Sequence, residues 1–271
     1  MSGSGRRAKK SLSQNFLVDP GLQRRIVSAI DPRPDDRVLE IGPGRGELTQ
    51  HLAYSVGRLT LVELDDELAA ELHELYRSRE DVEVIHGDAL DLSIPEIAGD
   101  LPLKVIGNIP YGITTPIIFH LLDGRPRPTL IVLTVQKEVA LRLAAKPGTK
   151  EYGALTVGVQ AVARVEPLFT IRRAAFRPRP DVDSMCVRIV PHSPPPLTLE
   201  QEAALRTLTR AAFQRRRKQL QNVLRQAPEY SLSGELVTAV LRPLGIDPAT
   251  RPDALPVADY VRLADALGRA A

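Results

Sequence analysis

Asn108, Pro110 and Tyr111 bring together three properties that could do chemistry at the end of a hydrophobic strand. The amide offers a carbonyl acceptor, proline fixes the direction of a backbone carbonyl, and tyrosine offers an aromatic face. Two carbonyls that accept hydrogen bonds from the amino group of a base would aim the nitrogen lone pair at a methyl donor. The second carbonyl would belong to Ile109 or Pro110. The alternative is a turn that Asn108 stabilises and under which Tyr111 packs.

A glycine-rich turn follows an earlier strand, in the segment VLEIGPGRGELTQHLA. Gly42 and Gly44 let a ligand approach the backbone and the open amides of the helix that follows. Glu63 and Asp88 end the next two strands, where acceptors can reach ribose hydroxyls and an adenine amino group. The glycine spacing is tighter than in dinucleotide sites, which favours S-adenosylmethionine over NAD. The alternative is that the two acids cap helices and the glycines serve only the turn.

The elements that would position these residues alternate between short apolar strands and amphipathic helices. This alternation predicts an α/β fold with a mostly parallel sheet and helices on both faces. The strand ends then meet at one edge of the sheet, where nucleoside cofactors bind, and this favours the catalytic interpretation of Asn108. Strands are expected at 37–42, 58–64, 82–87, 103–108 and 129–135, helices at 47–55 and 65–78, and two further strands, forming a hairpin-like edge, at 154–171 and 185–192.

The composition changes near residue 193, where three consecutive prolines make a stiff linker. Thr198, with Gln201 three positions later, is typical of a helix N-cap. The rest of the chain is expected to be helical, with breaks at Pro228, Pro243 and Pro252. We therefore expect a catalytic domain (21–192) and a small all-helical, RNA-binding domain (193–271), preceded by an N-terminal arm (1–20) for which the family resemblance described below implies a place over the cofactor.

Basic residues are distributed unevenly, although the formal net charge is only +3. No acidic residue occurs between Ala203 and Pro228, a stretch rich in arginine. Such a run is often only a solvated face, but a second basic cluster near the N-terminus favours a polyanionic partner. We expect a basic helix over 206–225 to hold phosphates, chiefly through Arg215, Arg216, Arg217 and Lys218.

Several classes of protein are disfavoured by composition. A single cysteine, Cys186, excludes an internal disulfide and suits a reducing cytoplasm. No apolar run is long enough to predict a membrane span. The five histidines show no metal-ligand spacing, so no metal is expected.

Eight segments, in order, resemble the ribosomal RNA adenine N6,N6-dimethyltransferases. They are KKSLSQNFLVD (9–19), LEIGPGRGELT (39–49), VELD (62–65), GDAL (87–90), GNIPYGITTPI (107–117), PGTKEYGALTV (147–157), FRPRPDVDS (176–184) and FQRRRKQLQN (213–222). Within the family, the chain is most similar to the bacterial kasugamycin-sensitivity enzymes, which dimethylate two adjacent adenosines near the 3′ end of 16S rRNA. The segment at 251–267 favours these over the erythromycin-resistance enzymes, which act on 23S rRNA.

The resemblance implies a class I methyltransferase (Rossmann-like) fold and S-adenosyl-L-methionine as cofactor. The partner would be 16S rRNA in the 30S subunit or its precursor, and the enzyme a cytoplasmic monomer with a role in ribosome biogenesis. Phe176 would stack on the target adenine opposite Tyr111. Gly112 and Ser13 depart from the family, which usually has Asn and Gly there. The implied cofactor contacts are Gln14, Asn15, Leu17, Gly42, Gly44, Glu63, Leu64, Asp88, Ala89 and Asn108.

Two further alternatives are weighed. One is a DNA adenine methyltransferase, and the other is a non-catalytic RNA-binding assembly factor or transcription cofactor that keeps the fold. The intact Glu63, Asp88 and Asn108 argue for catalysis. A stacked adenine hides its amino group, so the target must be unstacked, and an RNA hairpin loop or junction is the natural substrate.

Overall fold

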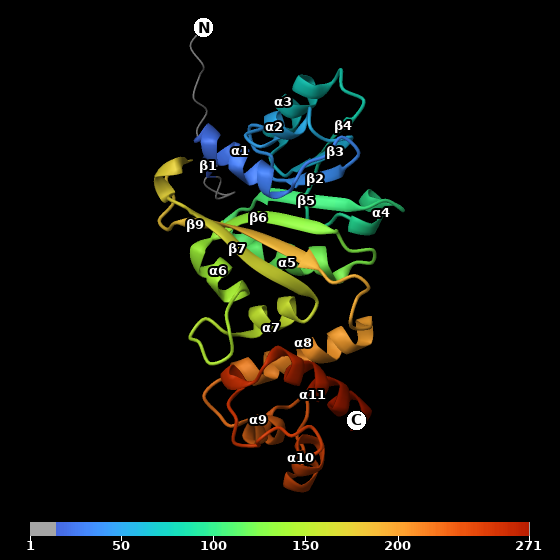
Figure 1. Cartoon of the computed structure of the whole chain (residues 1–271), viewed down its shortest axis with the longest axis vertical. Helices are drawn as coiled ribbons and strands as arrows, with labels where there is room; N and C mark the ends of the chain where they lie inside the picture. The colour runs from blue at the N-terminus through green and yellow to red at the C-terminus, as the bar shows by residue number, and fades with distance from the viewer. Residues whose placement is uncertain (1–14, 271) are drawn as a thin grey trace. The chain divides into compact units, whose positions relative to one another are not determined.

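The computed structural model describes residues 15–270, in which the main sheet has seven strands. Figure 1 shows them side by side in the order β4-β3-β2-β5-β6-β9-β7. Strands β2 to β6 are parallel to one another, and β9 is antiparallel to β6, so the expected mostly parallel sheet is confirmed. The bounds are β2 (Arg37–Ile41), β3 (Arg58–Glu63), β4 (Val82–His86), β5 (Leu103–Asn108), β6 (Leu130–Gln136), β7 (Ala163–Ile171) and β9 (Ser184–Pro191).

Both faces of the sheet are covered. On one face, Ile106 and Val132 share a core with Ile26, Leu52 and other side chains of the first three helices. Residues that alternate with them point to the opposite face, and these are also fully buried, as are apolar side chains of the helix between β5 and β6. The helices of this part are α1 (Pro20–Ala29), α2 (Thr49–Leu52), α3 (Asp66–Tyr76), α4 (Ile94–Ala98), α5 (Thr114–Asp123) and α6 (Lys137–Leu143).

A short two-stranded sheet lies beside the main one. Strand β1 (Phe16–Leu17) pairs antiparallel with β8 (Phe176–Arg177), with Phe16 opposite Arg177 and Leu17 opposite Phe176. The amide of Val18 continues the pairing by donating to the carbonyl of Ala175 (2.9 Å). The chain entering α1 is therefore fixed by a segment more than 150 residues later in the sequence.

Gly107, on β5 just before Asn108, leaves no room for a side chain. A Cβ there would lie 2.7 Å from the carbonyl oxygen of Ile41 and 2.8 Å from Cδ1 of Ile109. Gly112 has open space at the same position. We expect Gly107→Ala to lower the free energy of unfolding by about 1–3 kcal/mol, and Gly112→Ala to change it by less than about 0.5 kcal/mol. Chemical denaturation of the two variants in parallel checks this, and equal stabilities would refute it.

The chain divides into two compact units, the first comprising residues up to Ala140 with Glu166–Pro191, and the second Leu141–Val165 with His192–Ala271. The expected boundary at 192/193 is one residue from the observed one, but 141–165 groups with the C-terminal helices. Tyr152 shows why: its hydroxyl donates to the carbonyl of Leu255 (2.8 Å), and its ring meets the edge of Phe213. The helices of this unit are α7 (Ala154–Gln160), α8 (Leu199–Gln214), α9 (Leu220–Gln226), α10 (Gly234–Leu241) and α11 (Val257–Ala270).

Local expectations for this region had mixed outcomes. The N-cap at Thr198 is confirmed, because its hydroxyl accepts from the Gln201 amide (3.2 Å) and the Gln201 side chain accepts from the Thr198 amide (3.0 Å). The expected strand at 154–171 is wrong in its first half, which forms α7. The continuous basic helix over 206–225 is also wrong, because α8 ends at Gln214 and α9 begins at Leu220. Over the described residues, no helix is both long and apolar enough to cross a membrane.

Candidate active site

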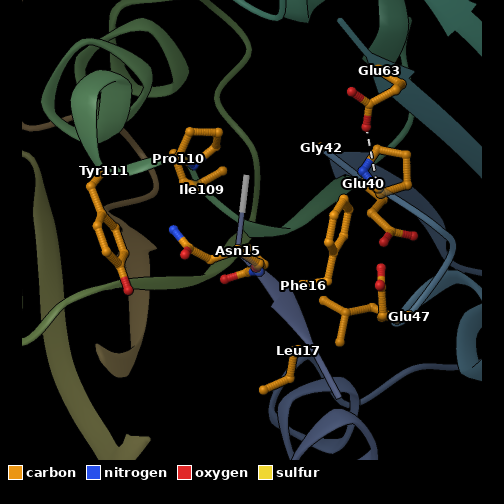
Figure 2. A pocket seen from close by; sticks show the side chains of 14 residues that line it. Asn15, Phe16, Leu17, Glu40, Gly42, Glu47, Glu63, Ile109, Pro110 and Tyr111 are labelled. Atoms are coloured by element: carbon orange, nitrogen blue, oxygen red, sulfur yellow. Dashed lines mark hydrogen bonds between the residues drawn. The ribbon is translucent and has the colours of Figure 1, made fainter. Parts of the chain in front are cut away.

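A cavity that is partly open to solvent lies at the carboxyl edge of the parallel strands. Figure 2 shows Tyr111 and Pro110 on one side of it and the carboxylates of Glu40, Glu47 and Glu63 on the other. The turn after β2 and the end of β5 meet here because parallel strands end at one edge, and β1 joins them through its separate pairing with β8. The full lining is Asn15, Phe16, Leu17, Glu40, Gly42, Pro43, Gly44, Glu47, Leu48, Glu63, Asn108, Ile109, Pro110 and Tyr111.

Asn108 is oriented by the N-terminal segment. Its Nδ2 donates to the backbone carbonyl of Asn15 (2.9 Å). Because the amide nitrogen has this partner, its Oδ1 is the atom left to accept a hydrogen bond, and no described residue donates to it. The side chain therefore presents an oriented acceptor at the cavity.

The backbone after Asn108 offers a second acceptor. The carbonyl of Pro110 already accepts from the amide of Ile113 (3.2 Å) and from the hydroxyl of Thr114 (3.4 Å). The carbonyl of Ile109 has no hydrogen bond within the described part of the chain. Of the two carbonyls that the sequence left open, that of Ile109 is the available one.

Tyr111 is the first residue of the one-turn 3₁₀ helix η2 (Tyr111–Ile113), and its side chain is fixed at the hydroxyl end. Its hydroxyl lies 2.8 Å from Oγ of Ser184, which is fully buried at the start of β9. Burial raises the pKa of the Tyr111 phenol, so it stays neutral over the physiological range. A neutral, anchored ring is suited to stacking on a planar ligand.

The glycine turn and Glu63 form one hydrogen-bonded unit. Gly42 and Gly44 both have positive φ (65° and 61°), a conformation that strains any other L-residue. The Gly44 amide donates to Oε2 of Glu63 (2.9 Å), and the Asp65 amide donates to Oε1 (3.0 Å). Each oxygen keeps a further lone pair, so the carboxylate can still accept from a ligand.

Two more carboxylates in the cavity were not singled out from the sequence. Glu40 is 1% exposed, and its Oε2 accepts from the hydroxyl of Thr49 (2.8 Å). Burial raises the pKa of Glu40 to about 8, although the Thr49 bond opposes the shift. Burial also raises the pKa of Glu47. A site lined by three acids attracts a cation, and binding one would favour the ionised form of Glu40.

Glu40 should make the stability of the ligand-free protein fall as the pH rises. Between about pH 4.5 and 8 the folded state holds a proton on Glu40 that the unfolded state has lost. The stability that this proton confers is present at acid pH and declines across that window, by up to about 1.4 kcal/mol per pH unit. In Glu40→Gln the decline should be shallower. Melting curves of both proteins at pH 5, 6, 7 and 8 test this, and parallel pH dependences would exclude it.

The sequence of the chain matches a protein family and several named relatives. The model of the family described as "Ribosomal RNA adenine dimethylase" matches residues 5–268. The ribosomal RNA small subunit methyltransferase A of Geobacter metallireducens is 42% identical over 270 residues, 98% of each chain. The chain belongs to the ribosomal RNA adenine dimethylase family.

Solved structures agree with this membership. A dimethyladenosine transferase from Plasmodium falciparum has a TM-score of 0.80 at 28% identity, covering 92% of this chain and 95% of that one. The 23S rRNA methyltransferase ErmE has a TM-score of 0.70 at 29% identity, covering 94% and 100%. The sheet of this rRNA adenine dimethylase therefore has the expected class I methyltransferase, Rossmann-like fold.

Several residues expected at the site line the cavity of this dimethylase, and others do not. Asn15, Leu17, Gly42, Gly44, Glu63, Asn108, Pro110 and Tyr111 lie there. Leu64, Asp88 and Ala89 are at the same sheet edge but outside the cavity, and Oδ1 of Asp88 accepts from the Leu90 amide (2.9 Å). Gln14 and Ser13 lie outside the described residues.

The structure does not bring Phe176 into the cavity. Its side chain is 1% exposed and packs in the core with Leu17, opposite which it stands on β8. Because its ring is buried, stacking of Phe176 on a target adenine stays a prediction. Phe16, rather than Phe176, is the second aromatic residue that lines the cavity beside Tyr111.

The basic residues 215–218 lie in the turn between α8 and α9, and their surroundings differ. Arg216 donates to the carbonyls of Lys150 (2.8 Å) and Thr149 (3.0 Å) and pairs with Asp253 (3.2 Å). Its role within the described structure is to hold the segment before α7. Arg217 and Lys218 are exposed, and Arg215 is half-buried. Among residues 15–270, no group of His, Cys, Asp and Glu is arranged to hold a metal ion.

Proposed function

We propose that the protein uses S-adenosylmethionine to dimethylate N6 of two adjacent adenosines near the 3′ end of 16S rRNA. The observation that carries the proposal is the orientation of Asn108. Its Nδ2 is bound to the Asn15 carbonyl, so its Oδ1 faces a partner that must be a donor. An adenine amino group is such a donor, and a cavity for a cationic cofactor adjoins it.

The residues of the cavity fit this cofactor. S-adenosylmethionine would supply the methyl group, carried on a positively charged sulfur. Glu63 would accept from the ribose hydroxyls while it continues to hold the Gly44 amide. A bound cation would favour the ionised forms of Glu40 and Glu47, whose pKa values burial raises, and their negative charge would then stabilise the sulfonium more than its neutral product. Asp88, Ala89 and Leu64 would contact the adenine of the cofactor at the same edge of the sheet.

Two acceptors would orient the target amino group. Oδ1 of Asn108 and the carbonyl of Ile109 would each accept one N–H, which draws the nitrogen toward tetrahedral geometry and aims its lone pair. No strong base is required, because the proton can leave once the methylated nitrogen is cationic. Alignment then supplies most of the rate. Tyr111, fixed by Ser184, would stack on the base.

Dimethylation places a second demand on the pocket. After the first transfer the amino group has one N–H left, and the same base must be accepted with its methyl turned away. One of the two carbonyls then loses its donor. The base must also leave its stack to reach Asn108, at a cost that is smallest in a loop.

The relatives support small-subunit rRNA as the target. The Geobacter metallireducens protein, at 42% identity, is named for the small subunit, whereas ErmE, named for 23S rRNA, is 29% identical. The partner would then be the 30S subunit or its precursor, and an enzyme that modifies it in bacteria works in the cytoplasm. We propose that it acts as a monomer.

Labelled S-adenosylmethionine tests the reaction and the target together. Undermethylated small subunits should take up label, while 50S particles and duplex DNA should not. Already methylated small subunits are the matched control and should take up little. Label found only in 23S RNA would contradict the 16S assignment, and label in duplex DNA would favour a DNA methyltransferase. Binding to subunits without incorporation would favour a non-catalytic assembly factor.

Arg217 and Lys218 give a prediction about RNA affinity. Both are exposed, so Arg217→Ala/Lys218→Ala should fold normally and bind small subunits more weakly, with a shallower salt dependence by about 1–2 in the log–log slope. Arg216→Ala would confuse the test, because it breaks the contacts with Thr149 and Lys150. Filter binding over a salt series measures the slope. An unaltered slope would mean that this turn does not contact RNA.

A further inference from the structure

Four arginines cluster in the segment 172–179 of the first unit. Arg172, Arg173, Arg177 and Arg179 are all exposed, and no acidic residue lies between them. The segment includes the turn η3 (Arg173–Ala175) and strand β8, and Figure 1 shows it as the yellow turn beside β1. The charge pattern of the sequence does not reveal this cluster, because the arginines are interrupted by apolar residues and prolines.

The charges of this segment are not neutralised within the described structure. None of the four guanidinium groups forms an ion pair there. Arg173 uses one nitrogen to donate to the Asp181 carbonyl (3.0 Å), and Arg177 uses one to donate to the carbonyls of Ala174 (3.1 Å) and Phe176 (2.9 Å). These bonds brace the turn and leave the other donors of each guanidinium open.

Arg172 and Arg179 have no hydrogen bond at all from their guanidinium groups to a described residue. Two nearby acidic residues, Asp181 and Asp183, do not neutralise the charges of Arg172 and Arg179. Asp183 accepts from the backbone amide of Arg173 (2.9 Å), and Asp181 offers only its carbonyl to that residue's side chain. The segment therefore presents a braced turn with two unoccupied guanidinium groups.

The segment is tied directly to the catalytic cavity. Arg177 stands opposite Phe16, which lines the cavity, and Asn15 directly precedes Phe16 in the chain. The Asn15 carbonyl is the acceptor that orients Asn108. Residues directly opposite each other in an antiparallel pair project to the same side. Arg177 therefore places positive charge opposite Phe16, one residue along the chain from Asn15, whose carbonyl orients Asn108.

We propose that the arginines of 172–179 bind phosphates of the nucleotides that flank the target adenosine in RNA. An unstacked base can be held only if the backbone on either side of it is held, and arginine binds phosphate through paired donors. This inference rests on the proposed function, because it takes the RNA substrate as given. It assigns to the catalytic unit an RNA contact separate from that of residues 215–218.

The test is Arg172→Gln/Arg179→Gln, which removes two charges without removing any internal bond. The matched control is Arg58→Gln/Arg77→Gln, which removes two exposed arginines, the first at the amino end of β3, opposite the cavity edge. Binding to undermethylated small subunits is measured over a salt series, and S-adenosylmethionine binding by calorimetry. We expect about tenfold weaker subunit binding for the test variant and a log–log salt slope shallower by about 1.4, with cofactor affinity unchanged.

Each outcome has one meaning. Equal subunit binding by the test variant, the control and the parent would overturn the proposal, as would an equal loss in test and control variants. A loss confined to the test variant, with unchanged cofactor affinity, supports it. Because the readout is binding, it is separate from turnover: a parent protein that binds subunits but transfers no methyl group would refute the proposed function and leave the arginine result to stand.

Discussion

Replacing Asn108 with alanine should leave most of the cofactor affinity intact and slow methyl transfer at least about 100-fold. The substitution removes the Oδ1 acceptor that would orient the target amino group. It also frees the Asn15 carbonyl, which now accepts from Nδ2 at 2.9 Å. Single-turnover methylation of undermethylated small subunits measures the rate, and calorimetry with S-adenosylmethionine measures the affinity.

Asn108→Asp distinguishes the role of the acceptor Oδ1 from that of the donor Nδ2. It keeps an acceptor oxygen for the substrate but places a carboxylate oxygen against the Asn15 carbonyl, where a donor stood. If the orienting bond matters, this variant should be nearly as slow as Asn108→Ala. A rate close to that of the parent in Asn108→Asp would reject the orienting role of Asn15, and an unchanged rate in Asn108→Ala would reject the catalytic role of Asn108.

Replacing Glu63 with alanine should weaken S-adenosylmethionine binding about 100-fold, since hydrogen bonds to a charged group contribute about 1.5–3 kcal/mol each. The loss has two sources. The ribose acceptor disappears, and the Gly44 amide loses the partner that fixes the glycine turn. Calorimetric titration of the purified variant gives the dissociation constant directly.

The control for Glu63 is Glu83→Ala, which removes an exposed carboxylate on the neighbouring strand that pairs only with Arg58. Its cofactor affinity should equal that of the parent. A change of less than threefold in Glu63→Ala would show that the cofactor does not use this strand end. Glu63→Gln should fall between the two, because it keeps one acceptor for the Gly44 amide.

The parallel core of the fold was predictable because its strands are apolar, short and separated by clear helical periods. Segment 154–171 was not, since ALTVGVQ is rich in the β-branched residues that favour strands, yet it forms α7. Packing against the C-terminal helices decided this, as Tyr152 shows. The break at 215–219 carries no proline or glycine, so the basic run reads as one helix until Arg216 is seen to bind Thr149 and Lys150.

At the site, the sequence predicted which residues end the strands but not the directions in which side chains point. Gly42, Glu63 and Asn108 meet because parallel strands end together, which is a property of the topology. Glu40 was missed because alternation places it in a strand interior, where a carboxylate is not expected. The β1–β8 pairing, which buries Phe176 and carries Asn15 to Asn108, joins segments too distant for any local pattern to reveal.

Gly112 departs from the family without an evident structural cost. Its Cβ position is open, and its φ is not among the positive values of the chain. The loop is braced instead by the Tyr111–Ser184 hydrogen bond and by the donors that bind the Pro110 carbonyl. The three residues expected to do the chemistry therefore keep their places without an asparagine at 112.

Mass mapping of RNA from undermethylated ribosomal subunits, after incubation with the protein and S-adenosylmethionine, tests the central claim most directly. The account predicts two methyl groups on N6 of each of two adjacent adenosines near the 3′ end of 16S rRNA, and none when Asn108→Ala replaces the parent. Methylation confined to 23S rRNA, or to a base atom other than N6 of adenine, would contradict it.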